Sequence, residues 1–472
     1  EVDGLFQMVA DGVGLSAVTV TEPDTIRYHL EKAVHLARSG RPGPVWLDIP
    51  LDVQSADIDE TRLRGFDTAG EHAPVRPETL RRQVTETIER INASERPVLL
   101  AGNGIRLAGG EREFKRLIEL LRIPVLTTWK AIDFLPESHP LYAGRPGAVG
   151  QRGANFAQQN ADCLLMIGAR MDFGQTGYNH ANLARAAVKI MVDIDPKEIG
   201  KMATRIDVPV CADARAFLRE LLARANELAT RNRSGWLARC KDWQARYPVI
   251  RPEHWTDDGY VNLYALIDVL SEQMTGEDLL IPGSSGACSE ATMQAFRVQE
   301  GMRIFNSEGL GPMGFGIAAS IGGCVASGGR RTVCVEGDGG FHMNSQELEV
   351  VRRLNLPVKF FVLNNQGYGS IRATQQNYFN GRFVASDASS GLTLPDICKI
   401  GRSYGIPSTS IKTNQELRKK VRSVLRSRGP AVCEVRISPD QVTAPKLYSM
   451  QRADGSIVSK PLEDLWPFLD RR

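Results

Sequence analysis

The order of apolar and polar positions predicts helices and strands that alternate along the chain. Near the start, the run Thr21-Glu22-Pro23-Asp24 offers a helix start, and apolar residues then recur at helical spacing up to position 36. The Gly- and Pro-rich stretch 40–44 breaks that helix, and residues 45–50 follow as a buried strand. This αβ unit, within residues 1–60, is too small to form a domain by itself.

The residues after this unit divide into a polar linker and two longer blocks. Residues 54–78 lack apolar periodicity, whereas 79–225 and 259–440 each alternate strand and helix patterns. The Arg- and Trp-rich stretch 226–258 predicts a helix that connects the two blocks. The strands predicted within the blocks are 98–101, 123–127, 163–167, 190–194, 332–335, 358–363 and 431–435.

Strands separated by helical stretches are typical of parallel sheets that carry helices on both faces. We therefore expect an α/β fold of consecutive parallel-sheet domains, a central Rossmann-like one at 79–225 and a second at 259–440. The tail, 441–472, mixes Pro, Asp and aromatic residues and is expected to extend along the surface.

The composition is that of an ordinary globular protein. Of the 472 residues, 42% are hydrophobic and 24% are charged, and the formal net charge is +3. This small charge gives no reason to expect nucleic acid or an anionic membrane as a partner. The eight cysteines form no CxxC pair, which favours buried thiols in a reducing compartment. Since no apolar run approaches the ~18 residues of a membrane span, we expect a cytoplasmic protein.

Two polar loops each follow a predicted strand of the second block. Residues 332–335 lead into a Gly-Asp-Gly-Gly run at 337–340, and residues 358–363 lead into an Asn-Asn-Gln-Gly run at 364–367. Both loops are therefore expected at the carboxyl ends of parallel strands, where open α/β sheets bind ligands.

The stretch between these loops is predicted to be a helix. Asn344 or Ser345 is expected as its N-cap, and Leu348, Val351 and Leu354 fall on the side that faces inward. The Gly-Asp-Gly and Asn-Asn runs are separated by 24 residues with a strand–helix–strand pattern, which matches the signature of thiamine-diphosphate enzymes. Either loop alone is more simply a turn, whereas the two together favour the cofactor.

The residue types in the loops suit a diphosphate and its Mg²⁺ ion. Mg²⁺ takes oxygen ligands in near-octahedral geometry. Asp338 offers a carboxylate, Asn365 a side-chain carbonyl and Gly367 a backbone carbonyl. Glycines let backbone amides approach phosphate oxygens without a side chain in the way. The glycines expected to do so are Gly337, Gly339 and Gly340.

Several stretches resemble the acetolactate (acetohydroxyacid) synthase large-subunit family of thiamine-diphosphate enzymes. They follow the family's order over almost the whole chain, and they are 40–50, 168–170, 192–196, 309–314 and 337–365. The resemblance implies a remnant of a pyrimidine-binding domain at 1–60, then a central domain and a diphosphate-binding domain. It also implies a homodimer or homotetramer that acts on a small 2-keto acid and a carbonyl acceptor.

The resemblance assigns roles to further residues of the second block. Met313 corresponds to the residue that wedges under the cofactor, and Gly311 to the one whose carbonyl accepts from the aminopyrimidine amine; a Met among glycines is also an ordinary core residue. Gly286 lies in the loop that holds the terminal phosphate. Relatives often have Gly-Gln-His there, where this chain has Gly-Ala-Cys, so the neighbouring Ser284 and Ser285 would have to supply side-chain donors.

The central block offers a nucleotide site whose occupant stays open. A predicted strand ends in Gly102-Asn103-Gly104, a tight turn that is not a full GxGxxG motif. Other thiamine-diphosphate decarboxylases keep this fold with an ADP-like ligand or with none, and an Asp at a strand end is also a common turn former. Flavin-containing relatives hold FAD at positions that correspond to Thr127, Arg152, Gly168, Arg170, Asp193 and Asp213.

Two departures from the family concern the acceptor substrate. Branched-chain synthases have an Arg where this chain has Gly174, and a Trp where it has Thr374. Loss of a bidentate, charge-assisted contact weakens carboxylate recognition, which opens acceptors other than pyruvate or 2-ketobutyrate. The run 368–372 also resembles synthase-like proteins of nucleotide-sugar pathways, which transfer an acetyl unit to a keto-sugar.

The resemblance implies a carboligase that removes CO₂ from a 2-keto acid, first of all pyruvate, and joins the two-carbon unit to a second carbonyl. A thiamine-diphosphate-dependent decarboxylase or lyase is the alternative. The family's activating Glu has no counterpart here, because Glu1 and Glu22 lie in the wrong context. We expect it upstream of Glu1, in a longer protein of which this chain is a part; a non-catalytic cofactor-binding subunit or fragment is the other interpretation.

Overall fold

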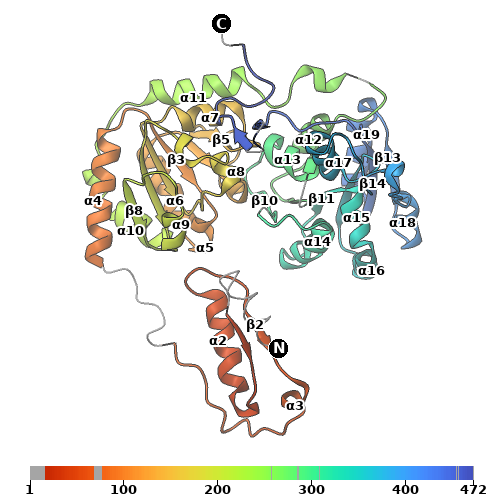
Figure 1. The fold of residues 1–472 in the computed structure, drawn as a ribbon, viewed down its shortest axis with the longest axis horizontal. Coiled ribbons are helices and arrows are strands. Elements are labelled where there is room, and N and C mark those ends of the chain that lie inside the picture. Colours follow the sequence, from red (N-terminus) through yellow and green to blue (C-terminus); the bar gives the residue numbers. More distant parts are fainter. Residues whose placement is uncertain are drawn as a thin grey trace.

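The computed structural model describes residues 16–68, 77–256, 258–283, 286–307, 309–452, 454 and 457–470. Two six-stranded parallel sheets form its two large bodies (Figure 1). This architecture confirms the predicted α/β fold with consecutive parallel sheets. No described helix is long and apolar enough to cross a membrane.

The central sheet is formed by residues of the first predicted block. Its strands are β3 (Pro97–Ala101), β4 (Val125–Thr127), β5 (Tyr142–Gly144), β6 (Cys163–Ile167), β7 (Val188–Asp193) and β8 (Val208–Cys211), in the order β5-β4-β3-β6-β7-β8. Leu99 faces one core cluster and Leu100 the other, because successive strand side chains point to opposite faces. The helices of this part are α4 (Pro77–Ala93), α5 (Gly104–Leu107), α6 (Glu111–Leu121), α7 (Arg152–Gln159), α8 (Phe173–Thr176), α9 (Pro196–Gly200), α10 (Ala214–Ala223) and α11 (Ser234–Arg246).

The second sheet is formed by residues of the second predicted block. Its strands are β9 (Leu279–Pro282), β10 (Arg303–Ile304), β11 (Thr332–Gly337), β12 (Val358–Asn364), β13 (Ser408–Ile411) and β14 (Ala431–Arg436), in the order β10-β9-β11-β12-β14-β13. Phe360 and Phe361 lie in separate core clusters, so this sheet too is buried on both faces. The helices are α12 (Leu263–Gln273), α13 (Gly286–Ala295), α14 (Phe315–Ala326), α15 (Asp338–Met343), α16 (Leu348–Arg353), α17 (Gly369–Tyr378), α18 (Ile397–Ser403) and α19 (Leu417–Arg426).

Short 3₁₀ segments connect many of these elements. They are η1 (Pro23–Thr25), η2 (Trp129–Phe134), η3 (His180–Asn182), η4 (Ala225–Glu227), η5 (Pro252–Trp255), η6 (Ser345–Glu347), η7 (Ala388–Ser390) and η8 (Asn414–Glu416). Of these, η2 matters most for the site, because it lies between the two sheets.

The N-terminal unit is a two-stranded parallel sheet with two helices. It comprises β1 (Ala17–Thr19), α2 (Ile26–Arg38), β2 (Trp46–Asp48) and α3 (Leu51–Gln54). The strand expected at 45–50 is confirmed as β2, but the expectation that it is buried was wrong, because Trp46 is 54% exposed. Within the described residues β2 pairs with β1 alone, and so short a sheet cannot cover its own faces. Arg41 links this unit to the central domain through ion pairs with Asp195 and Glu198.

The helix expected between the two polar loops begins earlier than predicted. It starts at Asp338 rather than after an N-cap at Asn344 or Ser345, and a 3₁₀ turn separates α15 from α16. Leu348 and Val351 are buried as predicted, whereas Leu354 is 47% exposed at the end of α16. The glycines after β11 therefore belong to the first turn of a helix and not to a loop.

The tail was expected to wrap along the surface as an extension of the chain. It forms a hairpin of β15 (Ser449–Gln451) and β16 (Ile457–Ser459), after which Leu462 and Leu465 are 2% and 0% exposed. Asn155 of α7 donates to the Leu462 carbonyl at 2.8 Å, so the tail packs onto the central domain. The apolar spacing of two leucines was too sparse a signal to predict this.

Candidate functional site

The two polar loops meet because β11 and β12 are neighbours in the sheet. The strands run parallel, with Gly337 paired to Leu363, so both end at the same edge. Asp338 begins α15 directly after β11, and Asn365 follows β12 by one residue. The sheet thus brings together the two residues that the sequence predicted as metal ligands.

The Asp338 carboxylate joins the two loops. It is 3% exposed, and its Oδ1 accepts the Gly339 N–H at 2.7 Å. Its Oδ2 accepts the N–H groups of Asn365 and Gly367 at 3.1 and 3.2 Å. Burial nevertheless raises the pKa of Asp338 to about 6, since the backbone donors offset only part of the lost hydration. A cation at this carboxylate would favour its charged form.

Asn365 supplies a second oxygen beside the Asp338 turn. Its Oδ1 is buried and makes no hydrogen bond within the described residues. A buried carbonyl oxygen of this kind is costly unless a ligand satisfies it. Together with Asp338 and the backbone carbonyl of Gly367, it forms an all-oxygen set, and these residues therefore fit a hard divalent ion such as Mg²⁺.

The glycines around Asp338 differ in what an added side chain would meet. A Cβ on Gly339 would come within 2.5 Å of the Tyr368 ring, and one on Gly340 would meet the Glu336 carboxylate. A Cβ on Gly337 would meet no described atom within 4 Å. Gly337 is thus the glycine that faces open space, where a ligand's phosphates have room.

Glu336 is a site residue that the sequence analysis missed. It is 2% exposed, and its carboxylate accepts the N–H groups of Gly337 and Gly316, each at 3.0 Å. Burial raises the pKa of Glu336 to about 7. A Cβ on Gly283, Gly316 or Gly340 would collide with this carboxylate, so three glycines make its cage. A charged residue at the end of a buried strand, directly before Gly-Asp-Gly, was the available signal.

The segment with Gly311 and Met313 leads into α14 beside this cage. Gly311 has φ 61° and Gly314 has φ 86°, conformations that favour glycine. Met313 Cε lies 3.0 Å from the position that a Gly339 Cβ would take, so the thioether reaches the Asp338 turn. Gly286 has φ 60°, and a Cβ there would come within 2.5 Å of Ser370 Oγ. Ser284 and Ser285, expected to supply donors beside Gly286, lie outside the described residues.

In the central domain, the predicted glycines form a close backbone contact. Gly102 donates to the Ile167 carbonyl at 2.9 Å, and Gly104 to the Gly168 carbonyl at 3.0 Å. A Cβ on Gly168 would lie 2.7 Å from the Gly104 Cα. The ends of β3 and β6 can approach this closely only because neither loop has side chains there.

Most of the other residues predicted from flavin-containing relatives have partners within the protein, whereas the buried Thr127 hydroxyl makes no hydrogen bond among the described residues. Arg152 donates to the carbonyls of Leu465 and Pro467 in the tail. Arg170 forms an ion pair with Glu198 at 3.3 Å, and Asp213 caps α10 by accepting the Ala216 N–H at 2.9 Å. Asp193 ends β7, where burial raises its pKa, and Thr127 is fully buried at the end of β4.

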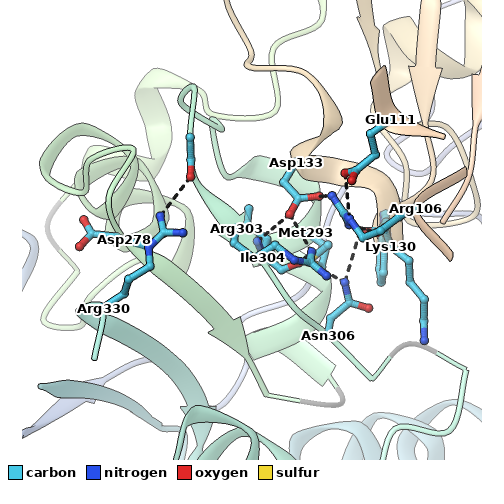
Figure 2. A network of polar contacts seen from close by, with 12 residues as sticks. Arg106, Glu111, Lys130, Asp133, Asp278, Met293, Arg303, Ile304, Asn306 and Arg330 are labelled. Atoms are coloured by element: carbon cyan, nitrogen blue, oxygen red, sulfur yellow. Dashed lines mark hydrogen bonds and ion pairs between the residues drawn. The ribbon is translucent and has the colours of Figure 1, made fainter. Parts of the chain in front are cut away.

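A buried polar network fixes the two sheets against each other (Figure 2). Asp133 of η2, whose side chain is 1% exposed, accepts from Arg106 at 2.8 Å. From the second sheet, Arg303 and the Ile304 N–H donate to the same carboxylate at 2.7 and 2.9 Å. Asn306 adds a bond of 3.3 Å to the Trp129 carbonyl. The strand that precedes the Gly311–Met313 segment is therefore held to the central domain.

The folds and loops described above define the class of protein. Residues 84–221 match the family described as the central domain of thiamine pyrophosphate enzymes, and residues 284–435 match the C-terminal TPP-binding domain of the same enzymes. Thiamine pyrophosphate is another name for thiamine diphosphate. The first match covers the whole central sheet, and the second covers the second sheet except for β9.

Within that class, three relatives identify the family. A probable acetolactate synthase large subunit of Methanocaldococcus jannaschii is 33% identical over 89% of this chain and 71% of its own length. The acetolactate synthase large subunit of Cyanidium caldarium is 30% identical over 91% and 72%, and that of Corynebacterium glutamicum is 32% identical over 84% and 63%. The chain belongs to the acetolactate synthase large-subunit family. It is a thiamine-diphosphate-dependent enzyme with acetolactate synthase-like function, as the sequence predicted.

Proposed function

We propose that the second sheet, within a diphosphate-binding domain at 259–440, holds thiamine diphosphate and Mg²⁺ for a carboligation that starts from pyruvate. The carrying observation is that the buried Oδ1 of Asn365 has no hydrogen-bond partner among the described residues, while the Asn365 N–H bonds to the buried Asp338 carboxylate. Asp338, Asn365 and the Gly367 carbonyl would hold the metal. Gly286, Gly311, Gly337, Gly339 and Gly340 would surround the cofactor together with Met313.

The cofactor supplies a carbon nucleophile and an electron sink for the bond that breaks when a 2-keto acid loses CO₂. The protein's own part is to bind, orient and exclude water. Glu336 accepts the backbone N–H groups of Gly316 and Gly337, which holds the start of α14 against the end of β11. The Met313 thioether lies next to the turn at Asp338. The dry environment that raises the pKa of Glu336 also disfavours charged groups that the site does not stabilise.

The test is release of CO₂ from pyruvate by the purified full-length protein, with and without added thiamine diphosphate and Mg²⁺. We expect release that depends on both. The Asp338→Ala variant is expected to lose the dependence on Mg²⁺ together with cofactor binding in calorimetry. No release from pyruvate or other small 2-keto acids would reject the proposal, and release without a product that contains a new carbon–carbon bond would indicate a decarboxylase or lyase.

For the central domain, a region that we delimit as 79–225, we propose FAD as the bound nucleotide. The position of Gly102, Gly104 and Gly168 at the carboxyl ends of the neighbouring parallel strands β3 and β6 supports it, because open α/β sheets bind nucleotides at that edge. Asp193, at the end of the neighbouring β7, is placed to accept ribose hydroxyls. A visible flavin absorption band in the purified protein is the expected result, and a colourless protein would reject it.

We also propose that the protein is a homodimer or homotetramer. Helix α14 is apolar almost all round, and its outer face exposes Ala318, Gly322, Val325 and Ala326. An apolar helix is normally covered, and in oligomers a second copy commonly covers it. Light scattering after gel filtration tests this. The eight cysteines, all free, support the cytoplasm as its compartment, which localisation of a tagged full-length protein would check.

A further inference from the structure

Helix α19 carries a dense group of positive charges on its outer side. The stretch 417–428 contains six basic residues and no acidic one. Leu417, Val421 and Val424 of the helix are buried in a core cluster of the second sheet. The basic side chains therefore lie on the opposite side of the helix, which faces solvent.

Most of these cations have no acidic partner. Arg418 pairs with Glu272 and Lys420 with Glu416, and none of the other four forms an ion pair within the described residues. We call these four exposed residues the basic face: Lys419, Arg422, Arg426 and Arg428. The first three stand at i, i+3 and i+7 of α19, so they form one stripe along the helix.

The N-terminal unit carries the opposite charge. The run 52–60, which begins in α3, contains four carboxylates and no Lys or Arg. All four are exposed, and we call them the acidic segment: Asp52, Asp57, Asp59 and Glu60. In the part of the chain that the structure describes, only Asp59 of this segment has an ion pair, with Arg62 at 3.3 Å. Leu51 and Ile58 are 79% and 41% exposed, so apolar surface adjoins these charges.

The basic face and the acidic segment cannot meet within one copy of the chain. Figure 1 shows α3 and α19 at opposite ends of the molecule. Each surface gathers charges of one sign that repel one another, and contact with the opposite sign removes this repulsion. A second copy of the chain brings an acidic segment that can reach the first copy's basic face.

The spacing of the charges suits such a contact. Asp57 and Asp59 are two residues apart in a stretch outside helices and strands, so their Cα atoms lie at most ~7 Å apart. Lys419 and Arg422 are three residues apart in the helix, a rise of ~4.5 Å. The long side chains of Lys and Arg cover the difference, and a guanidinium can bind a carboxylate with two parallel hydrogen bonds.

Helices α14 and α19 lie on opposite faces of the second sheet. Ile317 and Cys324 of α14 belong to one core cluster, whereas Leu417 and Val421 of α19 belong to the other. The dimer proposed above uses the outer face of α14, so the basic face lies on the side of the sheet away from that partner. A contact through α19 therefore reaches a copy in another dimer.

We infer that the basic face docks on the acidic segment of a second copy, and that this charge pairing joins two α14 dimers into a tetramer. A two-fold axis makes the contact twice, because each copy then offers its basic face to the other's acidic segment. Exposed ion pairs are individually weak and are screened by salt, so the tetramer depends on ionic strength. The inference rests on the proposed homodimer and not on the cofactor or the carboligation.

Analytical ultracentrifugation of the full-length protein at two salt concentrations tests the inference. We expect a tetramer in about 0.01 M salt, where charges interact over ~30 Å, and a dimer in about 1 M salt, where this range falls to ~3 Å. The apolar α14 contact should persist in both. A tetramer that persists in high salt, or a dimer at both concentrations, would overturn the inference and leave the homodimer standing. A monomer at both would overturn the two together.

Charge reversal at the basic face tests which helix makes the contact. The variant with Arg422→Glu and Arg426→Glu should form only dimers at low salt. The matched control carries Arg112→Glu and Arg116→Glu, two exposed arginines at the same i, i+4 spacing on α6, and it should remain a tetramer. A tetramer in the first variant, or loss of the tetramer in the control, would contradict the inference.

Reversal of both surfaces in one chain identifies the partner. Asp57→Lys and Asp59→Lys, added to the basic-face variant, should restore the tetramer at low salt, because the two surfaces have then exchanged their charges. Failure of this restoration in a basic-face variant that is dimeric would overturn the inference. The basic face would then bind a different polyanion, such as nucleic acid or an anionic membrane.

Discussion

Gly316 donates its backbone N–H to the Glu336 carboxylate at 3.0 Å, and this bond joins the first turn of α14 to the end of β11. The N-cap of α14 is Gly314, which has no side chain with which to cap the helix. Glu336 therefore caps α14 from another strand, and a carboxylate is favourable at a helix N-terminus. The same carboxylate also accepts the Gly337 N–H, so it fixes the position of the Met313 segment relative to Asp338.

Replacement of Glu336 should weaken cofactor binding. In Glu336→Gln the amide NH₂ must face one of two N–H donors, and one buried donor is left unpaired. We expect the Kd for thiamine diphosphate, measured by calorimetry in Mg²⁺, to rise about tenfold, since an unsatisfied buried donor costs about 1–3 kcal/mol. The control is Asp278→Asn, a buried carboxylate of the same sheet that pairs with Arg331. Equal Kd values for Glu336→Gln and the unaltered protein would contradict this role.

Asn365 should matter for the metal and not for the fold. Its Oδ1 has no hydrogen-bond partner within the described residues, so Asn365→Ala removes no internal bond of that oxygen. We expect the metal-free Tm to stay the same, while Mg²⁺-dependent cofactor binding weakens at least about tenfold. The neighbouring Asn364 donates to Glu434 at 2.6 Å, and Asn364→Ala should lower the Tm. A lower metal-free Tm in Asn365→Ala would show that Asn365 also stabilises the fold, which would contradict the prediction.

Asp133 should couple the two sheets. Asp133→Ala leaves the Arg106 and Arg303 guanidiniums without their shared carboxylate, and breaking a buried pair costs about 3–5 kcal/mol. Since the network bridges the bodies, we expect the unaltered protein to unfold in one calorimetric transition and Asp133→Ala to unfold in two. Asp278→Ala breaks a pair of similar burial inside the second sheet, and it should lower stability without a split. A split in Asp278→Ala alone would show that Asp133 does not couple the bodies.

Lys359 should make the stability of the folded protein increase with pH above about pH 8. It is 1% exposed, its Nζ donates to the Ser427 carbonyl at 2.8 Å and to the Gly429 carbonyl, and burial lowers its pKa to about 8. Below pH 8 the group is charged in both the folded and unfolded states. Between 8 and its ordinary value of 10.5 it is neutral only in the folded state, so its contribution to stability rises with pH.

The contribution of Lys359 to the free energy of unfolding rises by about 3 kcal/mol over this pH range. Lys359→Met should remove this component of the pH dependence, which chemical unfolding between pH 7.5 and about 10 measures against the unaltered protein. Identical slopes of stability against pH in the two proteins would contradict the assignment.

The sequence predicted the elements that carry their signal locally. The strands at 332–335 and 358–363 are continuous apolar runs, and Asp338 and Asn365 follow them at a recognisable spacing. The structure extends both strands by one or two residues and brings the two side chains to one edge. Parallel pairing of neighbouring strands was enough to predict this meeting, because it depends on topology and not on side-chain detail.

What the sequence did not predict depends on distant residues. The glycine cage of Glu336 takes residues from 283, 316 and 340, and Asp133 meets Arg303 from another sheet. No local pattern contains such pairs. The strand β9 was missed because it has four residues and ends in Pro282, and β13 was missed because its sequence is largely polar at a sheet edge. The exposure of Trp46 likewise reflects the number of strands around it rather than its own sequence.

The bond from Arg152 to the Leu465 carbonyl joins residues that are 313 positions apart. A ribosome that adds roughly 5–20 residues per second needs about 15–60 seconds to cover that distance. Once β8 has been made at Cys211, the central domain has its own six strands but still lacks the tail segment that bonds to α7. The packing of α7 is therefore completed only after the whole second sheet has been made.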